Sequence, residues 1–212
     1  MTRPSKTGVV SAVSSTLLFR LLFQPHAVFV ELSQIRPSPY SVFFKFVVWL
    51  AVLPPLFAYI GASNFGWRLG ASEPLFLPHD ELLGISIAYF LALLFGFVST
   101  AVILRWMATT YGARHSLGIH FAMVTIFGAP LAVGSAIHLF PDVFVNVIAL
   151  VPILIWSMYL LFKGLPIVLD ISPELGMLMS SSIIAYLMVA AVSLLGISVM
   201  LWGSGIGPSI GV

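Results

Sequence analysis

The amino-acid sequence predicts an all-α membrane protein, a polytopic bundle of five transmembrane helices. Hydrophobic residues make up 60% of the 212-residue chain and charged residues only 8%, whereas a soluble domain carries about 25% charged residues. Five apolar runs of about 20 residues are each long enough, as helices, to cross a hydrocarbon core of about 30 Å. These runs are Val42–Gly61, Leu82–Leu104, Gly118–Phe140, Val143–Phe162 and Ser182–Trp202. The composition excludes a soluble globular fold.

The placement of the nine Lys and Arg residues supports five spans and predicts their orientation. If the N-terminus is cytoplasmic, eight of the nine lie on the cytoplasmic side and only Arg68 lies on the other. Those eight are Arg3, Lys6, Arg20, Arg36, Lys45, Arg105, Arg114 and Lys163. Because cytoplasmic loops are enriched in basic residues, we expect a cytoplasmic N-terminus and a C-terminus on the opposite side.

The chain divides into a membrane domain at residues 17–202 and two tails, a cytoplasmic one at residues 1–16 and a Gly-rich one at residues 203–212. Leu17–Ile35 mixes apolar and polar residues. It predicts a short amphipathic helix lying in the cytoplasmic interface, with Arg20 and Arg36 facing lipid head groups.

The connections between spans are short and leave no room for a separate soluble domain. A mildly acidic loop at 62–81 carries the lone external Arg68, and the connection 105–117 is basic. A tight hairpin is expected at Pro141-Asp142. Leu165–Glu174, with two prolines, is interpreted as an interfacial cytoplasmic connection.

No residue pattern indicates catalysis or cofactor binding. The chain has no cysteine, and no phosphate-binding loop, zinc-binding helix or nucleophile motif is present. His120 and His138 lie near opposite ends of the third span, where we expect them to bond backbone carbonyls. Asn146 and Ser157 are interpreted as interhelical hydrogen-bond donors. We therefore expect a protein that is not an enzyme and that has no cofactor, metal or nucleic-acid partner.

Prolines inside the spans predict kinks at Pro54, Pro55, Pro130 and Pro152. A proline removes one helical hydrogen bond and frees a carbonyl oxygen. That oxygen either contacts a neighbouring helix or serves a solute at a broken helix. The sequence favours structural kinks, because no charged residue lies beside them.

Two further groups of residues are candidate contacts. Gly96 with Thr100, and Gly128 with Ala132, have the spacing of close helix packing or of contact with a partner helix. Five basic residues could bind anionic lipid or an acidic partner, unless they serve only to orient the chain. These are Arg20, Arg36, Arg105, Arg114 and Lys163.

Several short motifs, in order, resemble those of the bacterial Yip family. They are Leu21-Leu-Phe-Gln-Pro25, Val52-Leu-Pro-Pro-Leu-Phe-Ala-Tyr-Ile-Gly61, Tyr111-Gly-Ala-Arg-His-Ser116, Gly128-Ala-Pro130 and Tyr159-Leu-Leu-Phe-Lys-Gly-Leu-Pro166. Ala113 and His26 depart from the family pattern. The resemblance covers about residues 17–202. It implies an integral protein of the bacterial inner membrane with a cytoplasmic N-terminus and no catalytic site.

Eukaryotic Yip proteins resemble adaptors that bind prenylated Rab GTPases, a role that does not transfer to bacteria. The leading hypothesis is a non-enzymatic membrane scaffold or accessory subunit that organises lipid or binds other integral membrane proteins or its own copies. The alternative is a small-solute permease or lipid-handling protein that uses the proline-kinked helices.

Overall fold

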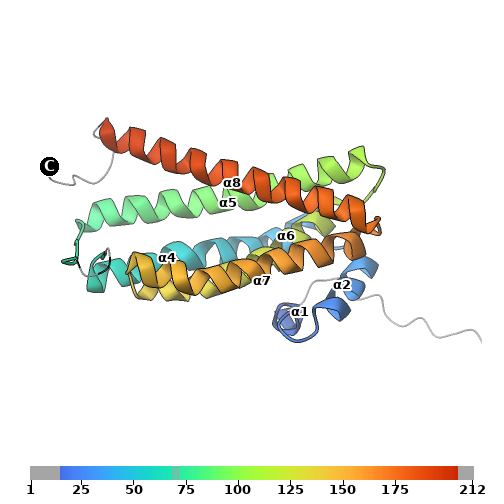
Figure 1. Cartoon of the computed structure of the whole chain (residues 1–212), viewed down its shortest axis with the longest axis horizontal. Helices are drawn as coiled ribbons and strands as arrows, with labels where there is room; N and C mark the ends of the chain where they lie inside the picture. The colour runs from blue at the N-terminus through green and yellow to red at the C-terminus, as the bar shows by residue number, and fades with distance from the viewer. Residues whose placement is uncertain (1–14, 69, 71, 205–212) are drawn as a thin grey trace, which may run out of the picture.

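The computed structural model describes residues 15–68, 70 and 72–204 as a bundle of long helices (Figure 1). Five of these helices are long and apolar enough to cross a membrane, which confirms the predicted fold class. They cover Pro39–Phe65, His79–Thr110, Leu117–Leu139, Val143–Leu169 and Pro173–Gly203. Over the described ranges, β-structure is limited to two isolated bridges, Trp67–Leu75 and Arg68–Asp142.

The helical elements follow in a simple order along the chain. Two short helices, α1 and α2, precede the spans, and the first and third spans each combine different helix types. The elements are α1 (Ser15–Arg20), α2 (Pro25–Gln34), α3 (Pro39–Val42), the π-helical turn η1 (Phe43–Val47), α4 (Val48–Phe65), α5 (His79–Thr110), α6 (Leu117–Gly134), the 3₁₀ turn η2 (Ser135–Leu139), α7 (Val143–Leu169) and α8 (Pro173–Gly203).

The two ends of the bundle take their names from their charges. The basic end carries α2, the α5–α6 connection and the α7–α8 turn. The Arg68 end carries the loop between α4 and α5, the η2–α7 turn and the end of α8. The predicted tails 1–16 and 203–212 lie almost wholly outside the described residues.

The third span lies at the centre of the bundle. In its most apolar segment 67% of the residues are buried, against 6% in α8. It packs against α4, α5 and α7, and residues 118–127 are all buried. Because this span is covered by protein, its apolar residues pack mainly against other helices, whereas those of α8 mainly face lipid.

The N-terminal segment differs from the expected single interfacial helix. The chain turns between α1 and α2, because Pro25 has no backbone N–H and begins a new helix. The apolar side of α2 is buried against α7, with Val28, Phe29 and Leu32 at most 1% exposed. An interfacial position is not confirmed, since α2 belongs to the protein core.

The connection expected at Leu165–Glu174 is present but much shorter than predicted. Pro166 lies inside α7, which continues to Leu169, and only three residues separate α7 from α8. Asp170 adopts a left-handed conformation (φ 50°), and Ile171 N–H donates to the Pro166 carbonyl at 3.1 Å. The chain reverses tightly here because Gly176 packs on the Pro166 ring, where an added Cβ would lie 2.9 Å away.

Candidate functional site

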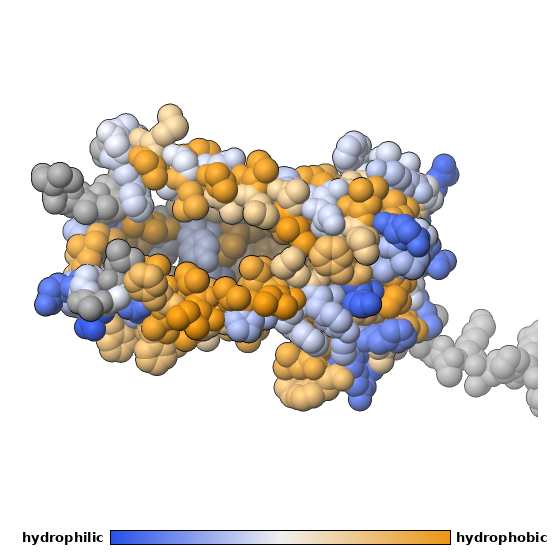
Figure 2. Space-filling model, in the orientation of Figure 1, coloured by the Kyte–Doolittle hydropathy of each residue, from blue (hydrophilic) through white to orange (hydrophobic). Residues whose placement is uncertain are grey.

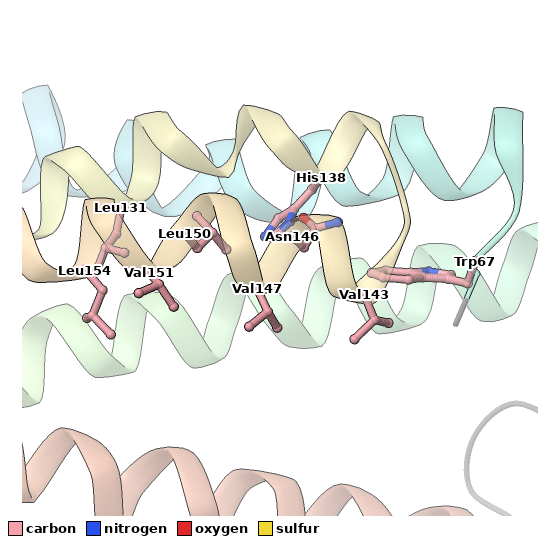
Figure 3. Close-up of a pocket in the computed structure, with 9 residues that line it drawn as sticks. All are labelled: Trp67, Leu131, His138, Val143, Asn146, Val147, Leu150, Val151 and Leu154. Atoms are coloured by element: carbon pink, nitrogen blue, oxygen red, sulfur yellow. Dashed lines mark hydrogen bonds between the residues drawn. The ribbon is translucent and has the colours of Figure 1, made fainter. Parts of the chain in front are cut away.

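A groove lies beside α5 and α7 near the Arg68 end, and Figure 2 shows that face hollowed between α8 and α7. One hollow has a volume of about 310 Å³ and an almost wholly apolar lining (Figure 3). It is lined by Trp67, Leu131, His138, Val143, Asn146, Val147, Leu150, Val151 and Leu154. Five of these nine residues are Val or Leu side chains of α7.

A second hollow of about 220 Å³ adjoins the first and extends toward α4 and α5. Its lining is Ala58, Trp67, Leu82, Ile85, Ser86, Tyr89 and His138. Trp67 and His138 line both hollows, so these two residues mark where they meet. We call the combined feature the α5–α7 groove. Its walls are apolar and its polar groups gather at the Arg68 end.

A hydrogen-bonded cluster builds the polar end of the groove. His138 Nδ1 of η2 contacts Asn146 Oδ1 of α7. The Asn146 amide nitrogen donates to the carbonyls of Phe140 and Asp142, each at 2.7 Å. Asp142 in turn caps α7 by accepting from the Val145 N–H at 3.0 Å. These bonds hold the η2–α7 turn, as the expected hairpin at Pro141-Asp142 requires.

The α4–α5 loop is tied to the same turn. The Arg68 N–H donates to the Pro141 carbonyl at 2.9 Å, and the Val143 N–H donates to the Arg68 carbonyl at 3.1 Å. Trp67 and Leu75 exchange two backbone hydrogen bonds of 2.8 Å. The loop therefore places the Trp67 ring at the mouth of the groove, where aromatic residues favour the membrane interface.

The five basic candidate residues lie at the basic end and do not form one site. Arg20 pairs with Glu31 at 2.8 Å. Arg36 donates to the carbonyls of Ser33 and Ile35 at the end of α2, each at 3.0 Å. The other three are exposed on separate elements: Arg105 on α5, Arg114 before α6 and Lys163 on α7. Two of the five therefore stabilise the N-terminal helices.

The small residues chosen from the sequence have unequal surroundings. A Cβ added to Gly128 would lie 2.8 Å from the Phe97 ring, so this glycine lets α5 approach α6. Around Gly96 there is open space. Thr100 is buried, and its hydroxyl bonds the Gly96 carbonyl within α5 at 2.6 Å. Ala132 is buried against Leu50 and Ala129.

The four candidate kink prolines lie inside continuous helices. Pro54 and Pro55 are buried in α4, Pro130 is half-buried in α6 and Pro152 is exposed on α7. None of the four lines the α5–α7 groove.

Sequence reasoning missed the closest helix contacts. An added Cβ at Gly164 would lie 2.7 Å from the Phe29 ring and 2.9 Å from Met123 Cε, so α2, α6 and α7 meet there. Gly61 and Gly118 are still more crowded, because an added Cβ there would overlap the carbonyl oxygens of His138 and Pro37. The search for small residues four apart in one helix could not find Gly164. The only signal for this residue in the sequence was its place in the Gly-Leu-Pro motif.

The polar residues of the spans have different environments. His120 is fully buried in α6 with Nδ1 2.8 Å from the Ser116 carbonyl, so it contacts a backbone carbonyl as expected. Ser157 is buried without a hydrogen-bond partner for Oγ. The Tyr186 hydroxyl of α8 donates to Ser99 of α5 at 2.6 Å. Within the described part of the chain, no three His, Cys, Asp or Glu residues gather as metal ligands.

The fold and these contacts define a class, a polytopic α-helical integral membrane protein. A model of the Yip1 domain family matches residues 19–195, so the chain belongs to this family. The chain is 30% identical over 159 residues to the inner membrane protein YohC of Escherichia coli, in strain K12 and in an O6:H1 strain. The match covers 75% of this chain and 82% of YohC. No solved structure matches the chain.

Proposed function

We propose that this protein is a non-enzymatic scaffold or accessory subunit that binds other integral membrane proteins or organises lipid. The observation that supports this role is the unpartnered distal part of α8. Its buried residues Gly176, Met179, Ser180 and Ile183 all lie in the part of the helix next to the basic end. From Ile184 to the end of the described chain, no residue is buried.

The distal part of α8 presents small side chains along one side. Ala190, Ser193 and Gly196 recur every three residues, and nothing lies within 4 Å of a Cβ added to Gly196. Helices associate in lipid mainly through close packing at such small residues and through hydrogen bonds. A second transmembrane helix could approach α8 closely along this side.

The test is purification in mild detergent from native membranes, with identification of membrane proteins that co-elute at constant stoichiometry. We expect a constant partner with the wild type, and its loss with Ser193→Leu or Gly196→Leu. Ala191→Leu is the matched control, because Ala191 is exposed on the same part of α8 but lies about 100° or more around the helix from the three small residues. If all variants keep the partner, α8 is not the contact surface. If the wild type elutes with no constant partner, the accessory role is wrong.

We also propose that the protein lies in the bacterial cytoplasmic membrane with the basic end in the cytoplasm. The distribution of Lys and Arg and the location of the E. coli relative support this assignment. The chain contains no cysteine, so single cysteines introduced at Ser33 and Glu73 report on opposite ends. A membrane-impermeant maleimide should label Glu73→Cys and not Ser33→Cys in intact spheroplasts. The opposite pattern would reverse the orientation.

The lipid-handling alternative is favoured by one observation, the α5–α7 groove. It predicts bound phospholipid in the purified protein, whereas a small-solute permease predicts flux of a solute in reconstituted vesicles. The absence of bound lipid would count against lipid handling.

A further inference from the structure

The α5–α7 groove has the depth of one membrane leaflet. Its α7 wall runs from Val143 to Leu154, which at 1.5 Å per residue is about 16 Å. Half of a hydrocarbon core of about 30 Å is about 15 Å. The groove starts at the polar turn that holds Asn146 and ends near mid-membrane. The apolar wall is therefore about as long as the acyl chain of a lipid in the leaflet at the Arg68 end.

The volume of the groove suits a thin occupant. A helix with its side chains is about 10–12 Å across, whereas the two hollows of the groove measure only about 310 and 220 Å³. An extended hydrocarbon chain is much thinner than a helix. The lining is almost wholly apolar below the Trp67–His138 level, so it complements methylene groups. Size and chemistry together select an acyl chain over a transmembrane helix.

The charges around the mouth favour one class of head group. The described residues of the Arg68 end carry one basic side chain and four acidic ones. The basic residue is Arg68, and the acidic residues are Glu73, Asp80, Glu81 and Asp142. This excess of negative charge disfavours an anionic lipid, whereas a zwitterionic lipid brings a phosphate for Arg68 and an ammonium for the carboxylates.

Glu81 provides an independent indication of a cationic ligand group. Its Oε2 is buried and has no hydrogen-bond partner in the described structure. Glu81 directly precedes Leu82, which lines the second hollow, and Ile85, one turn later, lines it too. A buried carboxylate oxygen without a partner is unfavourable unless a donor reaches it. A primary ammonium group supplies three N–H donors.

We propose that the α5–α7 groove binds one acyl chain of an amine-bearing zwitterionic phospholipid, with the head group between Trp67, Arg68 and Glu81. The inference deepens the lipid-organising part of the proposed function and rests on it. It differs from general lipid contact because it names one groove and one class of head group. The partner-binding side of α8 is not involved.

The test uses the full-length protein in phosphatidylcholine nanodiscs that contain a small fraction of phospholipid with a photoreactive acyl chain. The probe is either phosphatidylethanolamine or phosphatidylglycerol. After irradiation, mass spectrometry maps the labelled residues. We expect phosphatidylethanolamine to label α7 between Val143 and Leu154 more than any segment of α8, and phosphatidylglycerol to label it less.

Filling the groove should abolish this labelling. Val147→Trp places an indole in the larger hollow, and Leu154→Phe narrows its inner end; both positions are exposed, so the fold should tolerate them. Val192→Trp is the matched control on α8, where Val192 is 67% exposed against 56% for Val147. The groove variants should lose the α7 label and the control should keep it.

Three results would overturn the proposal. Equal label density on α7 and on the exposed part of α8 would mean ordinary contact with surrounding lipid. Cross-links to a second protein at Val147 would mean that a partner helix occupies the groove. Equal labelling by both probes, unchanged by Glu81→Gln, would remove the head-group assignment. The partner test uses variants at Ser193 and Gly196 of α8, whereas the lipid test uses labelling of α7. Either proposal can therefore fail while the other stands.

Discussion

The two ends of this bundle show opposite solutions to helix packing. At the basic end, α2, α6, α7 and the first turns of α8 enclose a dense core, and glycines bring their backbones together. At the Arg68 end, α5 and α7 leave a groove between them and α8 has no buried residue. The sequence is strongly apolar at both ends, so hydrophobicity does not explain the difference. The difference lies in which helices approach: α4, the third span and α7 pack closely toward both ends, whereas at the Arg68 end a groove lies beside α5 and α7 and α8 has no buried residue.

The comparison predicts that most of the free energy of unfolding comes from the basic end. The lipid binding that we propose uses the Arg68 end. Lipid is as apolar as leucine, so apolar residues alone do not drive helices together in a membrane. Close packing does: the crowded Gly118, Gly164 and Gly176 lie near the basic end, while Gly61 and Gly134 bring α4, the third span and α7 together toward the Arg68 end. The Arg68 end is held by the hydrogen-bonded turn at Asn146, which fixes the backbone and leaves the groove open.

The largest effect is expected from removing the α2 anchor. Phe29→Ala should lower the free energy of unfolding by about 3–5 kcal/mol, because Phe29 is 1% exposed and its loss leaves a cavity. Thermal unfolding in one fixed detergent measures the change. Phe23→Ala is the matched control, since Phe23 is 74% exposed. Equal effects of the two variants would show that α2 does not belong to the core.

Two glycine substitutions should change the free energy of unfolding in opposite directions. Gly164→Ala should destabilise the protein by about 1–3 kcal/mol, because the new Cβ overlaps Phe29 and Met123. Gly96→Ala should stabilise it by about 0.5–1 kcal/mol, because the site is open and alanine lowers the entropy of the unfolded chain. The same unfolding measurement compares them. A stabilising Gly164→Ala would contradict the close approach of α2 and α7.

Removing the Asn146 side chain should loosen only the turn at the Arg68 end. Asn146→Ala removes the contact with His138 and the amide donor to the carbonyls of Phe140 and Asp142. We expect the free energy of unfolding to fall by about 1–3 kcal/mol. Hydrogen exchange should quicken at the amides of residues 143–150 and stay unchanged at the basic end. Val145→Ala, at an exposed neighbouring position, serves as the control. Faster exchange throughout the bundle would show that the two ends are not independent.

The smallest effect is expected at the surface ion pair. Arg20→Gln removes the 2.8 Å contact with Glu31, whose side chains are both more than one third exposed. The loss should be about 0.2–1 kcal/mol and should shrink as salt is added. Arg105→Gln should have no such salt-dependent effect. A large, salt-independent loss for Arg20→Gln would mean that Arg20 supports α2 through packing.

Much of the architecture was predictable because the membrane constrains it. Five runs of about 20 apolar residues and the hairpin at Pro141-Asp142 led to the observed spans, although the helices extend several residues further. The apolar runs are shorter than the helices because charged residues such as Glu81, Arg105 and Lys163 bound them, while the helices continue beyond the hydrocarbon core. Pro166 lies inside α7, since Gly176 and the left-handed Asp170 let the chain reverse after it.

By itself, the sequence determined that the chain crosses the membrane five times and belongs with the Yip proteins. Length and hydropathy suffice for the five spans, because every backbone group inside the bilayer must be satisfied within a helix; the likeness to the Yip proteins rests on the short motifs. Only the tertiary structure decided that α2 joins the core, that Gly164 and not Gly96 is a close contact, and that Trp67 and His138 line one groove. These features depend on contacts between helices distant in sequence, which the periodicity of one helix does not encode.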